Sequence, residues 1–464
     1  MSFWTYQNLA DVTKGQWLVE PGDLSAEVTG LWHDTREIKP GQAYLAIAGE
    51  NFDGHDFVDK AFDAGAALAI VQRVPRQLAG RDESSATSPG RQAAGAPAPI
   101  LKVDDTVKAL QDLARAYRDV LKEGGCKVIG IAGSNGKTTT RHLVHHVLTH
   151  AGLKGTQSPK SFNNHLGVPL TLLQAKPSDD FVAAEIGTNH PGEIDFLSAI
   201  ARPDIAVITS IGEEHLEFFK DLDGVAEEEF SICDHLTEEG VVVAGLFNFD
   251  ERLRYRLDGR HDLMTPYDAD CDPPGGMRLF GEHNRANAKA AICVADLFVI
   301  DEATRDEALL SVEPAPHRGE LIRLGHDVTI YDDCYNANPA SVREALSLLN
   351  EFADGQGVFV FGDMFELGEV GPEEHRRVGE LVAASELTRF ITIGPLAELA
   401  HESAGHRTCD AHLPEWTNRT PGDVADLLQP GDTVLLKASR GMRLERLIPA
   451  IERRFGPPEG DEPT

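Results

Sequence analysis

The chain has 464 residues, 41% of them hydrophobic and 25% charged, values ordinary for a folded soluble protein. Its 43 basic and 75 acidic residues give a formal net charge of −32, so nucleic acid and anionic lipid should repel it. No apolar run approaches the ~20 residues that span a bilayer, and the first residues lack the pattern of a secretory signal. The six cysteines form no C-x-x-C pair, which argues against a zinc site or a disulfide framework. We therefore expect a cytoplasmic protein of two or three domains, with no nucleic-acid partner and no membrane insertion.

The first segment, residues 1–104, contains short apolar runs such as AYLAIAG and AALAIVQ. It closes in 79–99, which is rich in Ala, Gly, Ser and Pro and predicts a flexible loop or insertion. Apolar residues three and four apart predict a helix over 104–123.

Two further segments, 105–312 and 313–464, each alternate apolar runs with helix-length stretches. The expected strands lie in CKVIGIAG, FVAAEIG, DIAVITSIG and GVVVAGL of the second segment, and in DVTIYDD, GVFVFGD, RFITIG and DTVLLKAS of the third. This alternation predicts parallel sheets of the doubly wound kind. The fold class is therefore α/β in three domains, and 455–464 is expected to be a disordered tail.

Residues 127–140 have the context of a phosphate-binding loop, which is a strand, a glycine-bearing turn and a helix start. The strict pattern would place glycine at position 131, where the chain has Ile131, but Gly133 and Gly136 offer a tighter version of the same turn. Glycines let backbone N–H groups approach phosphate, and the helix start favours anions. The alternative is an ordinary strand-to-helix turn that carries a lysine by chance.

The loop, GSNGKTTT, resembles that of the Mur ligases, the ATP-dependent amide-forming enzymes that build the peptide of bacterial peptidoglycan. Further stretches resemble motifs of this family in the family's order: SFNNHLGVPLTLL, EIGTNHPGEI, ITSIGEEHLEFF, GEHNRANAKAA, YDDCYNANPASVREAL, FGDMFELGE and KASRGMRLE. Among family members, DDCYNANP and GDMFELG are similar to the ligase that adds D-alanyl-D-alanine to a UDP-N-acetylmuramoyl tripeptide.

This resemblance implies a uridine-nucleotide-binding α/β domain over 1–104, a central doubly wound ATP-binding domain of the P-loop type over 105–312, and a Rossmann-like domain for the amino substrate over 313–464. It implies a monomer that uses ATP and Mg²⁺ and passes through an acyl phosphate. Its partners are then small-molecule substrates.

The resemblance also implies site residues. ATP contacts fall on Gly133, Ser134, Asn135, Gly136, Lys137, Thr138, Thr139, Asn287, Arg318 and Asp333. Catalysis is assigned to Lys137, Glu185 and His215, and metal binding to Thr138, Glu185 and His215. Substrate contacts are assigned to Thr35 and Arg36 at the uridine end, to Asn163, Asn164 and Asn189 along the sugar-peptide, and to Ser439 and Arg440 at the incoming dipeptide.

The chain departs from the family at Glu229. Many Mur ligases have a lysine there that is modified to a carbamate and helps to hold a second magnesium. We hypothesise that Glu229, or else Glu228, supplies a built-in carboxylate, since carboxylates suit magnesium. The side chain is shorter than the carbamate, so the helix must lie nearer or a water must bridge. The alternative is that the EEE run is a solvated helix face.

A second departure is the short stretch between His215 and the GEHN motif, which predicts a trimmed central domain without a small antiparallel sheet. Two other functions stay open. One is a Mur-type amide ligase with a different amino substrate, and the other is a catalytically degenerate nucleotide-binding homologue.

Overall fold

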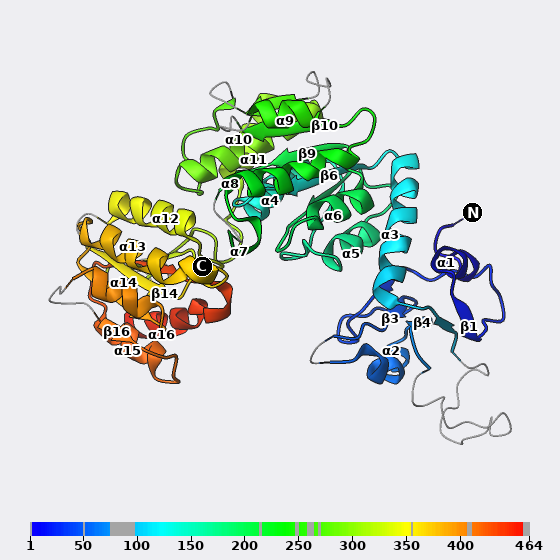
Figure 1. Cartoon of the computed structure of the whole chain (residues 1–464), viewed down its shortest axis with the longest axis horizontal. Helices are drawn as coiled ribbons and strands as arrows, with labels where there is room; N and C mark the ends of the chain where they lie inside the picture. The colour runs from blue at the N-terminus through cyan, green and yellow to red at the C-terminus, as the bar shows by residue number, and fades with distance from the viewer. Residues whose placement is uncertain are drawn as a thin grey trace.

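The computed structural model describes residues 2–49, 52–74, 98–212, 216–245, 250–257, 264–267, 271–353, 356–405 and 411–457. In this part of the chain the strands form three separate sheets that follow one another in sequence (Figure 1). The predicted loop at 79–99 lies almost entirely outside the described residues, as do the last seven positions of the predicted tail.

The first sheet has the order β1-β5-β4-β3-β2, with β1 antiparallel to β5 and the other pairs parallel. Its elements are α1 (Tyr6–Thr13), β1 (Gln16–Val19), β2 (Leu31–Trp32), β3 (Ala43–Leu45), α2 (Val58–Asp63), β4 (Leu68–Val71) and β5 (Ile100–Lys102). Leucine, isoleucine, valine, tyrosine and alanine side chains form a core on each face of this sheet.

Helix α3 (Thr106–Glu123) connects the first sheet to the second, and Figure 1 shows it running along the side of the central unit. Asp105 starts the helix, because its carboxylate accepts the N–H groups of Val107 and Lys108 at 2.7 and 2.9 Å. Further along α3, the Tyr117 hydroxyl donates to the carbonyl of Ala175 in the second unit at 2.8 Å. The helix therefore belongs to one continuous core that covers both units.

The second sheet is parallel throughout, in the order β11-β10-β9-β6-β8-β7. Along β6, Val128 and Ala132 face the core with α3, α5 and α6, whereas Ile129 and Ile131 face the core with α4 and α10. This alternation is what a strand buried on both sides requires. The strands are β6 (Lys127–Ala132), β7 (Gly155–Gln157), β8 (Phe181–Glu185), β9 (Ile205–Ile208), β10 (Val241–Gly245) and β11 (Met264–Tyr267).

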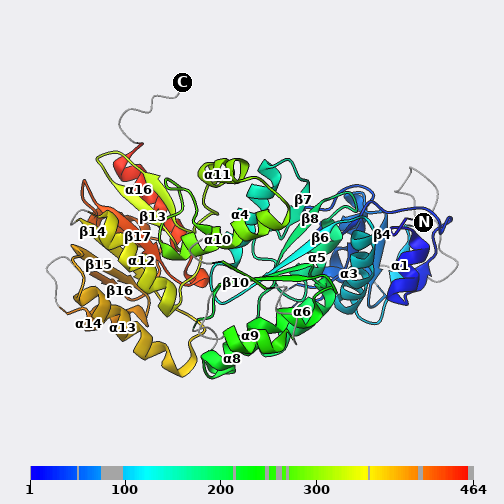
Figure 2. The same cartoon turned by 90° about the horizontal axis from the view of Figure 1, so that it is seen from above.

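Helices cover both faces of this sheet, as the doubly wound prediction requires (Figure 2). They are α4 (Lys137–His150), α5 (Gly167–Gln174), α6 (Glu193–Ala201), α7 (Leu216–Phe219), α8 (Leu222–Phe230), α9 (Asp250–Arg256), α10 (Glu282–Leu297) and α11 (Glu302–Ser311). The strand pairs among the described residues after β9 are parallel, and since parts of this stretch lie outside the described residues, the trimmed centre stays a prediction.

The third sheet has the order β12-β13-β17-β14-β15-β16, and only β12 runs antiparallel to its neighbour among the described strands. Its strands are β12 (Glu320–Arg323), β13 (Thr329–Asp332), β14 (Gly357–Gly362), β15 (Arg389–Ile393), β16 (Ala411–Leu413) and β17 (Thr433–Lys437). Its helices are α12 (Pro339–Phe352), α13 (Gly371–Ala383), α14 (Ala397–Ser403), α15 (Thr420–Leu427) and α16 (Ile448–Phe455). The predicted three-unit α/β architecture is confirmed. No helix among the described residues is long and apolar enough to cross a membrane.

Candidate active site

The turn between β6 and α4 requires glycine at two positions. Gly133 has φ of 123° and Gly136 has φ of 84°, both in the left-handed region. A Cβ atom on Gly133 would lie 2.2 Å from Thr209 Oγ1, and one on Gly136 would lie 2.2 Å from Asn287 Oδ1. Neither position can therefore accept a side chain without moving the chain around it.

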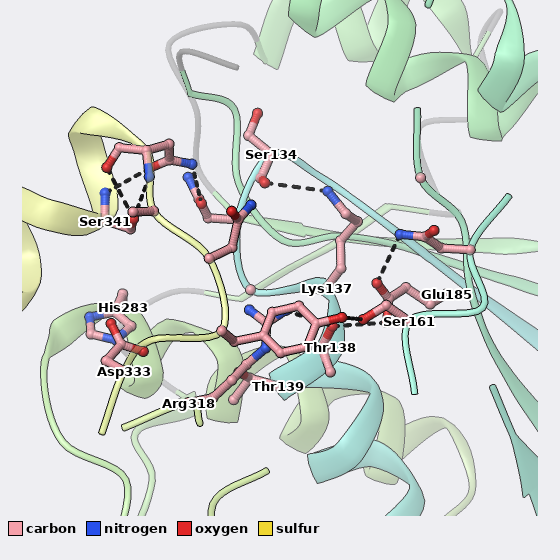
Figure 3. Close-up of a pocket in the computed structure, with 18 of the residues that line it drawn as sticks. Ser134, Lys137, Thr138, Thr139, Ser161, Glu185, His283, Arg318, Asp333 and Ser341 are labelled. Atoms are coloured by element: carbon pink, nitrogen blue, oxygen red, sulfur yellow. Dashed lines mark hydrogen bonds between the residues drawn. The ribbon is translucent and has the colours of Figure 1, made fainter. Parts of the chain in front are cut away.

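The end of β9 fixes this turn by hydrogen bonds. The N–H of Ser134 donates to the carbonyl of Ser210 at 2.9 Å, and the N–H of Asn135 donates to the Ser210 hydroxyl at 2.8 Å. The first N–H groups of α4 have no acceptor within the helix, as at any helix start, and can receive an anion. Lys137 folds back over the turn, with Nζ donating to the carbonyls of Gly133 and Ser134 (Figure 3).

A cavity of about 310 Å³ lies over the turn, between the second and third units. The second unit contributes the loop and the ends of its neighbouring strands, and the third unit contributes the segment after β13, the segment after β14 and the end of β17. Predicted residues that line it are Ser134, Asn135, Gly136, Lys137, Thr138, Thr139, Asn163, Glu185, Asn189, Asn287, Arg318 and Asp333.

Thr138 and Glu185 place two oxygens together at the floor of the cavity (Figure 3). The Thr138 hydroxyl donates to Glu185 Oε2 at 3.0 Å, and Asn163 Nδ2 donates to Oε1 at 3.1 Å. Arg141 Nε lies 3.6 Å from Oε2, and burial lowers the pKa of this guanidinium. Arg318 donates to the Thr138 hydroxyl at 3.2 Å. A carboxylate and a hydroxyl are hard donors of the kind that magnesium prefers.

The third unit supplies a row of polar groups from the segment after β13. Asp333 accepts from Lys437 Nζ at 2.5 Å, and the Arg318 guanidinium lies 4.1 Å from the centre of the Tyr335 ring. Besides the bond from Arg318 to Thr138, further hydrogen bonds join the units across the cavity: Tyr335 OH to Ser161 Oγ at 2.5 Å, and Asn338 Nδ2 to Asn135 Oδ1 at 2.7 Å. The cavity therefore depends on both units.

Sequence reasoning missed Tyr335, Lys437, Asn338 and Ser161 as lining residues. All four lie within motifs that carried the family resemblance, so these motifs could have indicated them as site residues. Their side-chain partners did not follow from sequence, because each partner lies on another element.

Five predicted substrate residues do not line the cavity. Asn164 accepts the N–H groups of Leu166 and Gly167 at the start of α5, and Ser439 is bonded to Phe365. Arg440 pairs with Glu445, while Thr35 and Arg36 belong to the first unit, where Arg36 pairs with Asp34.

The two candidate carboxylates on α8 are buried, so the solvated-face interpretation is wrong for them. Glu228 accepts the N–H groups of Gly192 and Ile194 at 2.7 and 2.9 Å and thereby caps α6. Glu229 Oε2 accepts the N–H of Gly133 at 2.5 Å, directly under the phosphate loop. His215 lies outside the described residues.

Three family models match the chain. They are described as the Mur ligase family catalytic domain over residues 27–118, the Mur ligase middle domain over 131–262 and the Mur ligase glutamate ligase domain over 317–440.

Named relatives cover nearly the whole chain. The UDP-N-acetylmuramoyl-tripeptide--D-alanyl-D-alanine ligase of Bacillus subtilis is 34% identical over 96% of this chain and 97% of its own. The crystal structure of MurF from Acinetobacter baumannii matches 97% of this chain and 99% of its own, with TM-score 0.81 and 28% identity. The MurF ligase of Thermotoga maritima in complex with ADP matches 91% and 97%, with TM-score 0.71 and 25% identity. The chain belongs to the Mur ligase family of ATP-dependent amide ligases.

Proposed function

We propose that this enzyme joins D-alanyl-D-alanine to a UDP-N-acetylmuramoyl tripeptide, with cleavage of ATP to ADP and phosphate. The observation that carries the proposal is the cavity itself. A phosphate-binding turn with Lys137 lies beside the Thr138–Glu185 pair, and the third unit closes the cavity with Arg318 and Asp333. The names of the full-length relatives supply the two substrates.

ATP occupies this cavity with its terminal phosphates on the turn and the start of α4. Lys137 swings from the loop carbonyls to the phosphates and neutralises their charge. Asn287 supports the turn at Gly136, and Arg318 offers a planar fork for phosphate. Asp333 accepts from the ribose hydroxyls and is held in place by Lys437.

Magnesium belongs at the Thr138 and Glu185 oxygens, with His215 and Glu229 assigned to a second ion. When bound, the metal neutralises phosphate charge and polarises the γ-phosphate. In this arrangement Arg318 leaves the Thr138 hydroxyl and turns to phosphate, while Arg141 and Asn163 continue to hold the Glu185 carboxylate.

The reaction has two steps. A carboxylate oxygen of the tripeptide attacks the γ-phosphorus, the bond to the β-phosphate oxygen breaks, and ADP leaves. The amine of the dipeptide then attacks the carbonyl carbon of the acyl phosphate, which expels phosphate and loses a proton. Contacts from both units exclude water from this intermediate.

The substrates reach the cavity from opposite ends. We assign the uridine nucleotide to the first unit at Thr35 and Arg36, and the sugar-peptide to Asn163, Asn164 and Asn189. The dipeptide lies on the third unit near Ser439 and Arg440, whose guanidinium suits its carboxylate. The domain limits at 104 and 312 belong to the same proposal, as do a monomeric state and action in the cytoplasm.

A phosphate-release assay with a panel of amines tests the proposal. With ATP, Mg²⁺ and the tripeptide nucleotide, D-alanyl-D-alanine should give the fastest release, and single amino acids should give only background. Faster release with a single amino acid would identify a ligase of different amine specificity. No release with any amine would identify a degenerate homologue.

A further inference from the structure

A second group of donor atoms lies behind the cavity, on the far side of Arg318. His317 Nδ1 lies 2.6 Å from Asp332 Oδ2, and Cys334 Sγ joins them so that the three atoms are within 4.8 Å of one another. Glu445 Oε2 lies 3.9 Å from the same sulfur, while its other oxygen pairs with Arg440. Nitrogen, sulfur and one carboxylate therefore converge in the third unit, and the Glu445 carboxylate lies beside the sulfur.

Burial makes this group unusual. Asp332 is 0% exposed, and no lysine or arginine of the described chain forms an ion pair with it. Among the described residues its carboxylate has the His317 ring, the N–H of Cys334 and the Cys334 thiol as hydrogen-bond partners. Burial, with the neighbouring carboxylates, raises the pKa of the Cys334 thiol, so the cluster is acidic and poor in fixed positive charge. A buried carboxylate is paired with a cation or binds a metal, and in the metal-free chain the protonated His317 ring is the group that fills this role.

We propose that His317, Asp332 and Cys334 bind a zinc-class divalent cation, with Glu445 as the fourth donor. Imidazole, thiolate and carboxylate are the ligands of tetrahedral zinc sites, at about 2.0–2.3 Å from the metal. Ligand atoms in such a site are separated by roughly 3.5 Å. The atoms of His317, Asp332 and Cys334 therefore need only small side-chain shifts, whereas the Glu445 carboxylate must turn from the sulfur towards the metal. The proton on the thiol is released to solvent, and the proton between Nδ1 and Asp332 moves to Nε2 or to solvent.

The cation would connect three elements that surround the nucleotide cavity. His317 belongs to the turn before β12, where it adopts φ of 62°, and it directly precedes Arg318. Asp332 ends β13, Cys334 directly follows Asp333, and Glu445 lies in the 3-10 turn Leu444–Leu447. Metal binding would therefore fix the turn that presents Arg318 to Thr138. The spacing of these residues along the chain matches no zinc motif, which is why the sequence did not reveal them.

Cobalt(II) titration of the full-length protein, without ATP or substrates, tests the site directly. The wild type should develop a thiolate-to-cobalt charge-transfer band in the near ultraviolet, and zinc should abolish it because zinc competes for the same ligands. Excess magnesium should leave the band unchanged, since magnesium avoids thiolate. The readout is independent of ligase activity. Absence of a band in the wild type would overturn the proposal.

Cysteine variants then identify the thiol. Cys334→Ser should abolish the band, and His317→Ala should weaken zinc affinity by about tenfold or more. Cys271→Ser is the matched control, because Cys271 Sγ lies 3.5 Å from Cys293 Sγ and forms the competing thiol pair. A band that survives Cys334→Ser, or that disappears in Cys271→Ser, would place the metal elsewhere and refute the assignment.

Discussion

Glu229 is the residue at which this chain departs most clearly from the resemblance that its motifs carry. Its carboxylate is 0% exposed, and one oxygen accepts the N–H of Gly133 at 2.5 Å. The side chain therefore lies under the phosphate loop, where a carboxylate can both hold the backbone and add negative charge. A negative charge matters there only if a cation is bound nearby, as in the second magnesium site that we propose.

The Glu229→Gln variant separates these two duties. Glutamine keeps an acceptor for the Gly133 N–H but removes the charge, so the turnover number should fall at least about tenfold while the unfolding temperature changes little. Turnover would be measured by phosphate release at several magnesium concentrations. Unchanged turnover at low magnesium would show that Glu229 only supports the loop.

Glu228→Gln is the matched control on the same helix, because the hydrogen bonds of Glu228 go to Thr188, Gly192 and Ile194 around the start of α6. It should lower stability modestly and leave the magnesium dependence unchanged.

A built-in carboxylate also predicts that added bicarbonate has no effect on the turnover of the wild type. Stimulation by bicarbonate would mean that a lysine carbamate exists after all.

At the scale of elements, α4 connects the phosphate loop to the segment that enters the third unit. His142 Nε2 lies 2.9 Å from the carbonyl of Glu313, and His146 Nε2 lies 3.0 Å from Ser311 Oγ. Burial lowers the pKa of His142, His145 and His146, because the charged ring is poorly solvated there. The folded protein thus binds fewer protons at these rings than the unfolded chain does.

This difference predicts acid sensitivity. Above about pH 6.5 these histidines have no effect on the free energy of unfolding, because they are neutral in both the folded and the unfolded chain. Below that pH the unfolded chain takes up more protons than the folded protein, so stability falls. The His142→Gln, His146→Gln double variant can still donate to Glu313 and Ser311 but cannot titrate. Its unfolding temperature should fall less between pH 7.5 and 5.5 than that of the wild type. Equal slopes would contradict the assignment.

The sequence predicted eight apolar strands of the second and third units because each is buried on both faces and is followed by a helix. It missed the edge strands of these units, β7, β11, β12 and β16, which carry no distinct apolar pattern. Such edge strands form because they can hydrogen-bond to a neighbouring strand. The hydrophobic periodicity of the sequence does not predict which segments find such a neighbour.

The site residues divide in the same way, into those that the local sequence predicts and those that depend on the folded arrangement. Lys137, Thr138 and Glu185 were found because a strand end or a helix start dictates where they lie. The Lys437–Asp333 pair was not found because it depends on how β13 and β17 pair within the third unit, and the Tyr335–Ser161 contact was not found because it depends on how two units meet. Ser439 stays a predicted substrate residue, and its hydroxyl accepts the N–H of Phe365 at 2.8 Å, a contact that the sequence did not indicate.

At the scale of the whole molecule, the net charge of −32 opposes the compact state through self-repulsion. It also repels the anionic substrates, so local cations such as Lys137 and Arg318 must overcome the global field. Many acidic side chains nevertheless form exposed ion pairs, which contribute little each.

Salt should therefore stabilise this protein. Raising the ionic strength from about 0.01 to 1 M shortens the Debye length from about 30 to 3 Å and screens the repulsion. The unfolding temperature measured in sodium chloride should rise by several degrees over this range. A fall would show that attractive ion pairs outweigh the net repulsion.

The central claim is that the cavity between the second and third units activates a carboxyl group by phosphorylation. The most direct measurement uses tripeptide nucleotide labelled with ¹⁸O in the reacting carboxylate, with ATP, Mg²⁺ and D-alanyl-D-alanine. Mass spectrometry of the released phosphate should find one ¹⁸O atom in each molecule, and Lys137→Met should release almost none. Unlabelled phosphate from the wild type, accompanied by amide product, would contradict the acyl phosphate and the role assigned to this cavity.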